Sequence, residues 1–265
     1  MAKNDAASDK SPLHHIAMGS GDNIAILLHG FPMNHHLWDF VAPLLADDMR
    51  LIIPDLRGFG QSLVKGPLEL SLKSMADDVA QLMSELGIEK AHIIGASMGA
   101  MVAMAFAYYH GERTQSVVVM HSEADPDDEE IKIRRNAQIK TIRNQGSNAF
   151  AHQFARRVLG SDTEAEKLTF VSNMMADASA KAMVAGMRLL RDREDLRLLL
   201  PRIEAPALVV AGQNDPHSPA DLMEQTAALF PNGQFHIMDN ANHLSAIECP
   251  QSAAKVIRGW VGSHT

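Results

Sequence analysis

The sequence predicts an α/β protein in which a mostly parallel sheet is flanked by helices, with one helical insertion. Short apolar runs alternate with longer segments of helical periodicity from about Leu13 onward, which is the pattern of strands joined by crossover helices. The alternation breaks once, over residues 125–201, where no strand pattern is visible. Since an unstructured loop of that length would be improbable in a compact domain, and its composition favours helices, we expect a helical cap inserted into the α/β core.

The elements follow in order along the chain. Residues 1–12 are polar and lack the apolar centre of a signal peptide, so we expect a disordered tail. Residues 13–124 and 202–265 form the predicted core. The short segment before residue 24 leaves room for only about one strand, so the first strand of the sheet is expected to be missing or irregular. Strands are predicted at 24–28, 51–54, 91–96, 116–120, 207–211 and 234–238, and the spacing of apolar residues predicts a helix over 72–86.

Composition limits the class of protein. The chain has 265 residues, of which 46% are hydrophobic and 21% charged, which is typical of a globular protein with a large core. Its net charge of −8 disfavours a nucleic-acid partner, and no apolar run approaches the roughly 18 residues that cross a bilayer. We therefore expect a cytoplasmic protein with a small-molecule partner and neither a nucleic-acid nor a membrane partner. Nothing in the sequence specifies an oligomeric state.

The sequence predicts neither a disulfide nor a metal site. Cys249 is the only cysteine, so neither an internal disulfide nor a cysteine metal cluster can form. It precedes Pro250 and is expected to pack at the entrance to the last helix. His35 and His36 form a histidine pair, but no carboxylate at ligand spacing supports a metal site there. The sequence therefore predicts no metal.

The segment Gly95-Ala96-Ser97-Met98-Gly99 carries the strongest chemical signal. It follows an apolar run and opens into an alanine-rich segment that ends at Tyr109. A sharp strand-to-helix turn with serine at its apex is a nucleophile elbow, in which small flanking residues permit a strained turn. A five-residue match arises often by chance, so its weight depends on the partners found elsewhere in the chain.

A serine nucleophile needs a base and an acid that orients the base. In this architecture they follow the serine in the order acid, then histidine, each after a later strand. Of 13 histidines, His243 lies just beyond the last predicted strand and before the last helix. Asp215 follows the strand 207–211 through a glycine turn and is the favoured acid. Glu123, just after the strand 116–120, is the alternative.

Ester cleavage also needs donors for the oxyanion that develops on the carbonyl oxygen. The backbone N–H of Met98, directly after the serine, is one candidate. The second is the N–H of Phe31, in the turn His29-Gly30-Phe31-Pro32 after the first core strand. Asp55 precedes the serine in the chain and is interpreted as a structural charge within a turn.

These motifs together resemble the α/β-hydrolase family over nearly the whole chain. The segments that carry the resemblance are His29-Gly30-Phe31-Pro32, Asp55-Leu56-Arg57-Gly58-Phe59-Gly60-Gln61-Ser62, Gly95-Ala96-Ser97-Met98-Gly99, Gly212-Gln213-Asn214-Asp215-Pro216 and Asn242-His243-Leu244-Ser245. They look most like the branch that contains small carboxylesterases, enol-lactonases and cofactor-free perhydrolases. The resemblance implies the α/β-hydrolase fold and a serine nucleophile.

Departures from other branches narrow the expected chemistry. Ser97 stands where haloalkane dehalogenases and epoxide hydrolases of the family carry aspartate. Epoxide hydrolases also use cap tyrosines, whereas Tyr108 and Tyr109, the only tyrosines, fall on the helix after the elbow. Carbon–carbon bond hydrolases usually carry a Ser-Gly-Gly-type oxyanion loop and a tryptophan after the catalytic histidine. Phe31 and Leu244 occupy those positions here.

The sequence thus predicts a serine hydrolase that cleaves a carboxylic ester or lactone through an acyl-enzyme on Ser97, with His243 as base and Asp215 orienting it. No metal or organic cofactor is expected. Two alternatives remain open. A perhydrolase would use the same residues with hydrogen peroxide in place of water, and a slow-turnover ligand-binding protein would keep the pocket for recognition.

Apolar residues of the cap and of the sheet edge are expected to contact the substrate. They are Phe31, Met120, Phe150, Phe154, Met174, Met175, Met183, Met187 and Leu244. This set predicts a preference for uncharged esters with short to medium apolar acyl groups. The cap also carries many arginines, whose clustering in pairs near acidic residues favours solvated helix faces. Examples are Arg134, Arg135, Arg143, Arg156, Arg157, Arg188 and Arg191. A single arginine turned inward would instead pair with a substrate carboxylate.

Overall fold

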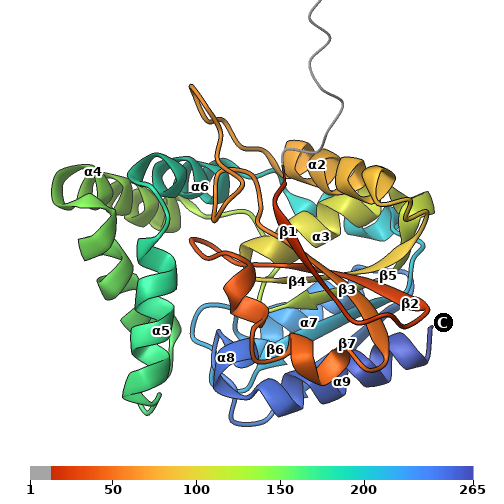
Figure 1. Cartoon of the computed structure of the whole chain (residues 1–265). Helices are drawn as coiled ribbons and strands as arrows, with labels where there is room; N and C mark the ends of the chain where they lie inside the picture. Colours follow the sequence, from red (N-terminus) through yellow and green to blue (C-terminus); the bar gives the residue numbers. More distant parts are fainter. Residues whose placement is uncertain (1–12, 265) are drawn as a thin grey trace, which may run out of the picture.

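The computed structural model describes residues 13–264, so the predicted tail, residues 1–12, lies outside the described part of the chain. A seven-stranded sheet in the order β1-β3-β2-β4-β5-β6-β7 forms the centre of the molecule (Figure 1). The strands are β1 (His15–Met18), β2 (Asn23–Leu28), β3 (Met49–Pro54), β4 (Ala91–Ala96), β5 (Thr114–Met120), β6 (Ala207–Gly212) and β7 (Gly233–Met238). The α/β-hydrolase fold predicted from the sequence is confirmed.

All six predicted strands are present, and the segment before residue 24 supplies a seventh. That strand, β1, is only four residues long and pairs antiparallel with the edge of β3, whereas all other neighbouring strands are parallel. Every residue of β4 and β6 is buried, as expected for central strands covered by helices on both faces. Their short, mostly apolar runs are what made them recognisable in the sequence.

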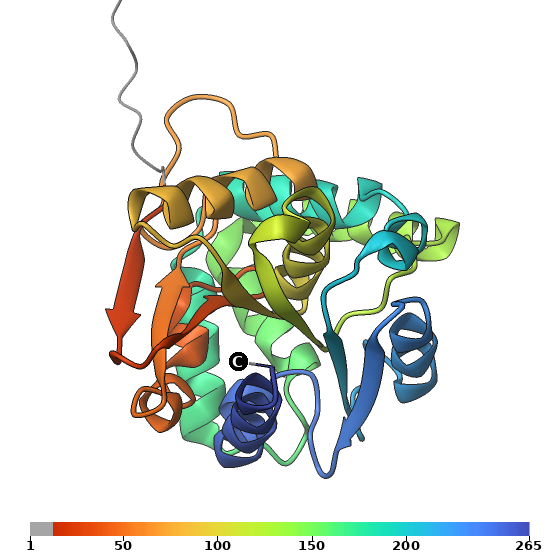
Figure 2. The same cartoon turned by 90° about the vertical axis from the view of Figure 1, so that its right-hand side faces the viewer.

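Helices cover both faces of the sheet. Figures 1 and 2 show α2 and α3 on one face and α9 on the other. Outside the cap, the helical elements are the 3₁₀ helix η1 (His35–Trp38), α1 (Ala42–Leu45), α2 (Leu72–Glu85), α3 (Met98–Tyr109), η2 (Gly111–Arg113), α7 (Ala220–Ala228), α8 (Ser245–Glu248) and α9 (Pro250–Gly262). The predicted helix 72–86 corresponds to α2, whose start is fixed by a capping box between Ser71 and Ser74. Its buried apolar stripe packs against the core.

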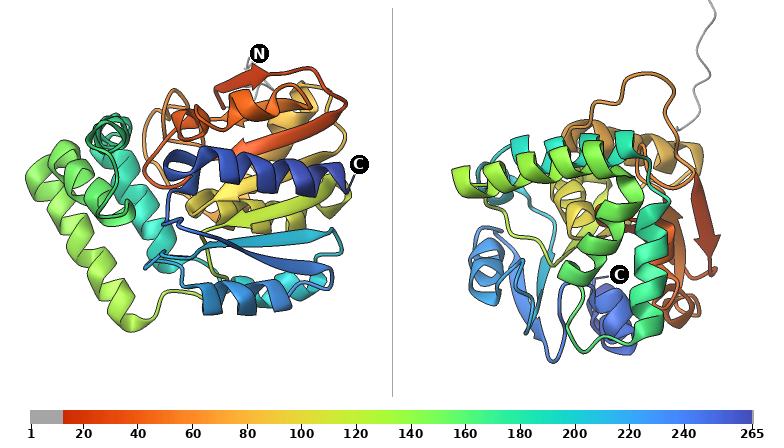
Figure 3. Two further views of the ribbon diagram at one scale, coloured as in Figure 1. Left: turned by 90° about the horizontal axis from the view of Figure 1, so that it is seen from below. Right: turned by 90° about the vertical axis from the view of Figure 1, so that its left-hand side faces the viewer.

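The long segment between β5 and β6 is helical. It contains α4 (Glu129–Val158), α5 (Ala165–Ala176), α6 (Ala180–Asp192) and the short 3₁₀ helices η3 (Leu196–Leu198) and η4 (Leu200–Arg202). We call residues 125–201 the cap. Helix α4 is interrupted at Gly146, whose φ of 87° is left-handed, so its two arms run in different directions (Figure 3). The cap helices gather at one end of the sheet.

Two smaller observations complete the fold. Cys249 is half-buried immediately before α9, and burial raises the pKa of its thiol to about 11. It is therefore a packed residue and a poor nucleophile. Within residues 13–264, none of the helices has the combination of length and apolar character that crossing a membrane requires.

Candidate active site

Ser97 lies at the tight turn between β4 and α3. Its φ of 53° and ψ of −119° are costly for a residue with a side chain, and its N–H donates to the carbonyl oxygen of Met120 at 2.8 Å. Gly95 and Gly99 flank the turn, and neighbouring backbone atoms leave no space for a Cβ at either position. A Cβ on Gly95 would lie 2.2 Å from the carbonyl oxygen of Gly99, and one on Gly99 would lie 2.3 Å from that of Leu28. The motif therefore forms a strained elbow in which neither glycine can carry a side chain.

Gly99→Ala is expected to destabilise the protein, although Gly99 lies in a helix, where alanine is normally favoured by about 1 kcal/mol. The methyl group would press on backbone atoms of β2 that cannot move aside, and overpacking of this kind costs about 1–3 kcal/mol or more. Thermal unfolding should show a Tm lower by several degrees. Gly259→Ala is the matched control, because Gly259 is exposed in α9 and a Cβ there meets nothing within 4 Å. A Tm for Gly99→Ala equal to or above that of the control would contradict this account.

Three predicted residues meet in one chain of hydrogen bonds. The Nε2 atom of His243 lies 3.0 Å from Oγ of Ser97, and its Nδ1 atom lies 2.8 Å from Oδ2 of Asp215. Ser97 follows the carboxyl end of β4, Asp215 follows that of β6, and His243 follows that of β7. Because parallel strands end at the same edge of the sheet, residues distant in sequence converge there. This is the arrangement of a nucleophile, its base and the acid that orients the base.

The surroundings of Asp215 hold its carboxylate in the charged form. Oδ1 accepts hydrogen bonds from the backbone N–H groups of His217 and Ser218, and Oδ2 accepts from His243 and His121. Burial alone would raise the pKa of Asp215, but the charge of His243 and the hydrogen bonds from both histidines hold it far below its ordinary range. The carboxylate is therefore charged at neutral pH and fully hydrogen-bonded.

His121 is a site residue that the sequence analysis missed. It follows β5 directly with a φ of 56°, and its ring is buried. Nδ1 lies 3.2 Å from Oδ2 of Asp215, and Nε2 lies 2.6 Å from Oγ of Ser245. Because a carboxylate cannot donate, Nδ1–H of His121 donates to Asp215 while Nε2 accepts the Ser245 hydroxyl proton. Burial lowers the pKa of His121 and is only partly opposed by Asp215, so the ring is neutral. Its position directly after a core strand was the only signal in the sequence.

Glu123, the alternative acid, lies elsewhere in the same site. Its Oε1 atom is 3.9 Å from Nη2 of Arg193, and no hydrogen bond joins it to His243 within residues 13–264. The structure thus brings Asp215, and not Glu123, into contact with His243. Glu123 acts on His243 only through its charge, which raises the pKa of the imidazole slightly.

The loop after β2 packs directly on the elbow. A Cβ on Gly30 would lie 3.2 Å from Cβ of Ser97, so the backbone passes close to the serine. Phe31 and Met98 are both buried, and their N–H groups have no acceptor in the described part of the chain. Buried N–H groups without an acceptor are rare unless they serve a ligand.

His29 connects this loop to the neighbouring turn. Its Nε2 accepts the N–H of Leu56 at 2.9 Å, and its Nδ1–H donates to the carbonyl oxygen of Gly30 at 2.9 Å. Burial lowers the pKa of His29 to about 4, so the ring remains neutral and keeps this tautomer. The shape of the loop therefore depends on a histidine that does not itself reach Ser97.

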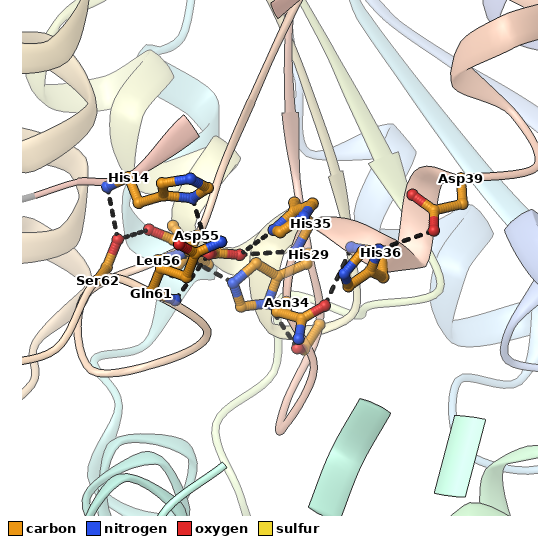
Figure 4. A network of polar contacts seen from close by, with 11 residues as sticks. His14, His29, Asn34, His35, His36, Asp39, Asp55, Leu56, Gln61 and Ser62 are labelled. Atoms are coloured by element: carbon orange, nitrogen blue, oxygen red, sulfur yellow. Dashed lines mark hydrogen bonds and ion pairs between the residues drawn. The ribbon is translucent and has the colours of Figure 1, made fainter. Parts of the chain in front are cut away.

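Asp55 forms the centre of a second polar network, shown in Figure 4. Its carboxylate accepts the backbone N–H groups of His35 and Gln61, each at 2.8 Å, and contacts Nδ1 of His35 at 2.8 Å and Nδ1 of His14 at 3.1 Å. Sequence spacing alone did not point to a carboxylate partner for His35, because the fold supplies one from 20 residues away. This network fixes the turn that holds His29, as the structural interpretation of Asp55 predicted.

Two groups of three residues have side-chain atoms close enough to bind a metal ion jointly, namely His14, His35 and Asp55, and His121, Asp215 and His243. In both groups the carboxylate already accepts several hydrogen bonds, and the histidines are its donors. We interpret both as hydrogen-bond networks.

The family follows from comparison with known proteins. A family model described as alpha/beta hydrolase fold matches residues 25–250. The chain belongs to the α/β-hydrolase family.

Among curated relatives of this hydrolase, the pimeloyl-[acyl-carrier protein] methyl ester esterase of Aeromonas hydrophila is 29% identical over 252 residues, covering 92% of this chain and 97% of that protein. The 3-oxoadipate enol-lactonase 1 of Acinetobacter baylyi is 28% identical over 236 residues, covering 87% and 85%. Among solved structures, a thermophilic esterase from Thermogutta terrifontis is 33% identical with a TM-score of 0.89, covering 96% of this chain and 94% of that one. The relatives named here are thus two esterases and an enol-lactonase.

A cavity of about 180 Å³ opens above Ser97 and His243. It is smaller than the roughly 300–1,000 Å³ of pockets that hold drug-sized ligands, which favours a small substrate. Phe31 and Phe154, two of the predicted substrate contacts, line it. The lining does not include the other predicted substrate contacts, Met120, Phe150, Met174, Met175, Met183, Met187 and Leu244. These side chains are buried in the hydrophobic core of the sheet and cap, because packing the cap consumes the apolar faces of its helices.

The cavity is also more polar than expected. Arg134, Arg135 and Arg157 line it, together with Glu123 and Asp127. Arg134 and Arg157 are exposed, as expected for solvated helix faces, but these faces border the cavity. Spacing along a helix shows which residues share a face, but only the placement of α4 decides what that face covers.

Two further residues connect the cap to the site. Nε2–H of His217 donates to the carbonyl oxygen of Arg157 at 2.7 Å, and the His217 ring lies edge-on to that of His243, with centroids 5.2 Å apart. Glu248 accepts the backbone N–H of Gly160 at 2.9 Å and that of Leu244 at 3.2 Å. The loop that carries His243 is thus linked to the cap through Glu248 and through the His217 ring. Neither residue has a sequence signal of its own.

Proposed function

We propose that this hydrolase cleaves a carboxylic ester or lactone of a small molecule through an acyl-enzyme on Ser97. The proposal is carried by the hydrogen-bond chain from Ser97 through His243 to Asp215, which ends at a cavity open to a substrate. A serine hydroxyl is a weak nucleophile at neutral pH, and this geometry supplies the base that it lacks.

Acylation begins when Oγ of Ser97 attacks the carbonyl carbon while Nε2 of His243 takes the hydroxyl proton. The tetrahedral intermediate collapses as the ester C–O bond breaks, and His243 returns the proton to the leaving alkoxide. Water then attacks the acyl-enzyme with His243 again as base, and Ser97 leaves as the hydroxyl. Asp215 keeps Nδ1 protonated and stabilises the imidazolium in both halves.

The N–H groups of Phe31 and Met98 are the proposed oxyanion donors. Both lie in the segments that enclose Ser97, and both lack an acceptor among residues 13–264. One such donor contributes about 2.7–4 kcal/mol to transition-state stabilisation in a comparable hydrolase. Phe31 and Phe154 are the proposed apolar substrate contacts.

The relatives support an oxygen-ester substrate. The names of two of them, a methyl ester esterase and an enol-lactonase, both describe cleavage of an acyl–oxygen bond. On Ser97 an ester and a lactone would both form an acyl-enzyme, and they differ only in whether the leaving alcohol remains attached to the acyl group. Open-chain esters and lactones therefore both belong in the substrate search.

The pH dependence of kcat/KM should report His243. Burial lowers the pKa of His243, but the Asp215 carboxylate and its hydrogen bond outweigh this effect, so the net pKa lies above 6.5. Only the neutral ring can accept the serine proton, so activity should be lost as the pH falls through this raised pKa. The acid limb of the profile is expected above pH 6.5. A midpoint at or below that value would contradict the assigned electrostatics.

The function is tested with a panel of esters and lactones of graded acyl length, assayed with water alone and with added hydrogen peroxide. We expect many turnovers per active site in water. Peracid formation that exceeds hydrolysis would assign the chain to the perhydrolases instead. Product limited to about one equivalent per protein would indicate a ligand-binding protein and overturn the proposal.

A further inference from the structure

A groove between the two arms of α4 leads into the active-site cavity. It has a volume of about 260 Å³ and is lined by both arms, with Ala137 and Thr141 before the kink and Phe150 and Gln153 after it. Four residues line the groove and the cavity alike, namely Arg134, Gln138, Phe154 and Arg157. The two spaces are therefore neighbours that share a wall, and this shared wall carries two guanidinium groups, one from each arm of α4.

The acidic residues of the cavity are already paired with other arginines. Asp127 accepts from Nε of Arg135 at 3.0 Å and contacts the buried Arg193, and Glu123 also lies near Arg193. These pairs neutralise one another.

Arg134 and Arg157 are different. Among residues 13–264, no carboxylate lies within ion-pair distance of either guanidinium. Both remain charged at neutral pH, in a chain whose net charge is −8. The shared wall thus carries positive charge for which the described part of the protein supplies no partner.

Arg157 is held close to the catalytic histidine. Its carbonyl oxygen accepts from His217, and the His217 ring packs on His243. The backbone of Arg157 is therefore connected to His243 through the ring of His217, while the Arg157 side chain is exposed. Because Ser97 and Arg157 line the same cavity, a substrate bound at Ser97 can extend toward this guanidinium.

We propose that the substrate carries a carboxylate, which Arg134 and Arg157 bind while the ester or lactone carbonyl lies at Ser97. This inference rests on the proposed function and specifies its substrate class. Guanidinium groups match carboxylates in planar, bidentate geometry, and the proposal replaces the uncharged substrate expected from the sequence. Since both arginines are exposed, we expect each to contribute about tenfold to kcat/KM, well below the value for a buried pair.

The test uses esters that differ only in one terminal group. Monoethyl succinate, glutarate and adipate are compared with ethyl esters in which a methyl group replaces the carboxylate, and acetoxybutyrate is compared with butyl acetate to place the charge on the alcohol side. The ratio of kcat/KM between charged and neutral partners is measured for each pair. Since each arginine is expected to contribute about tenfold, we expect a ratio of about 100 for at least one pair, and a decrease as salt is added.

Variants assign that ratio to the two arginines. Arg134→Gln and Arg157→Gln should each reduce it about tenfold, and Arg157→Lys should retain part of it. Arg156→Gln and Arg143→Gln, which alter exposed cap arginines outside both linings, should leave it unchanged. A ratio near one in the wild type, or a high ratio that survives both glutamine variants, would overturn the proposal.

Binding separates this proposal from the proposed function. If the wild type hydrolyses neither member of any pair, the esterase proposal fails, and calorimetry with glutarate and adipate still tests the anion site. Binding that is lost in the Arg134→Gln, Arg157→Gln double variant would support the site. Equal binding, or none to either protein, would refute it.

Discussion

Ser97→Ala is expected to lower kcat by several orders of magnitude, on the order of 10⁴- to 10⁶-fold. The variant loses the attacking oxygen, while Asp215, His243 and the oxyanion donors remain in place. Folding should be retained, because within residues 13–264 the side chain of Ser97 makes a hydrogen bond to His243 alone. Alanine also has the same Cβ at this strained φ. Ester hydrolysis and thermal unfolding of the same preparations separate the two effects.

A fluorophosphonate probe provides an independent measurement. Peptide mapping should find one adduct, on Ser97, in the wild type and none in Ser97→Ala. Ser252→Ala is the control, since Ser252 is exposed on α9 at the far end of the chain from the elbow. Labelling of another serine, or substantial activity in Ser97→Ala, would show that the nucleophile lies elsewhere.

Asp215→Asn should lower kcat on the order of 10⁴-fold. The amide keeps the shape but removes the charge that stabilises the imidazolium. It also introduces a donor group among four donors, the two histidine rings and the N–H groups of His217 and Ser218. The residual activity should show its acid limb at lower pH than the wild type, because Asp215 is the main group that raises the pKa of His243.

Glu123→Gln is the matched comparison. Glu123 lines the same cavity but makes no hydrogen bond to His243 within the described residues, so its loss should change kcat by less than about tenfold. The measurement is kcat for both variants on one ester at saturating concentration. If Glu123→Gln were the more damaging of the two, the acid would be the one after β5, and the assignment of Asp215 would be wrong.

Local physics explains why the sequence predicted so much of the core. The glycines at 95 and 99 follow from atoms within or next to the turn itself. Asp215 lies shortly after the buried apolar strand β6, and His243 lies shortly after β7, the last strand. Because parallel strands end at one sheet edge, a residue just after a strand is placed near Ser97 by connectivity alone. The α/β fold and the order Ser97, Asp215, His243 could therefore be predicted without the tertiary structure.

Contacts between distant segments leave no comparable pattern in the sequence. His121 contacts Asp215 although 94 residues separate them in the sequence. Only this contact, beside the one from His243, identifies His121 as a residue of the site. His14 likewise meets Asp55 where β1 pairs with β3, and His35 meets it from η1. Nothing local to any of these residues encodes its partner.

The cap shows most clearly which features follow from local sequence and which depend on tertiary packing. Its helical character was predictable from composition, because helix propensity and apolar spacing are local properties. The orientation of its faces was not. The left-handed Gly146 divides α4, so that Phe150 turns into the packing while Arg134 and Arg157 line the cavity. The sequence by itself determined the fold and the candidate triad, whereas the polarity of the pocket was decided only when tertiary packing buried the methionines and left the arginines over the serine.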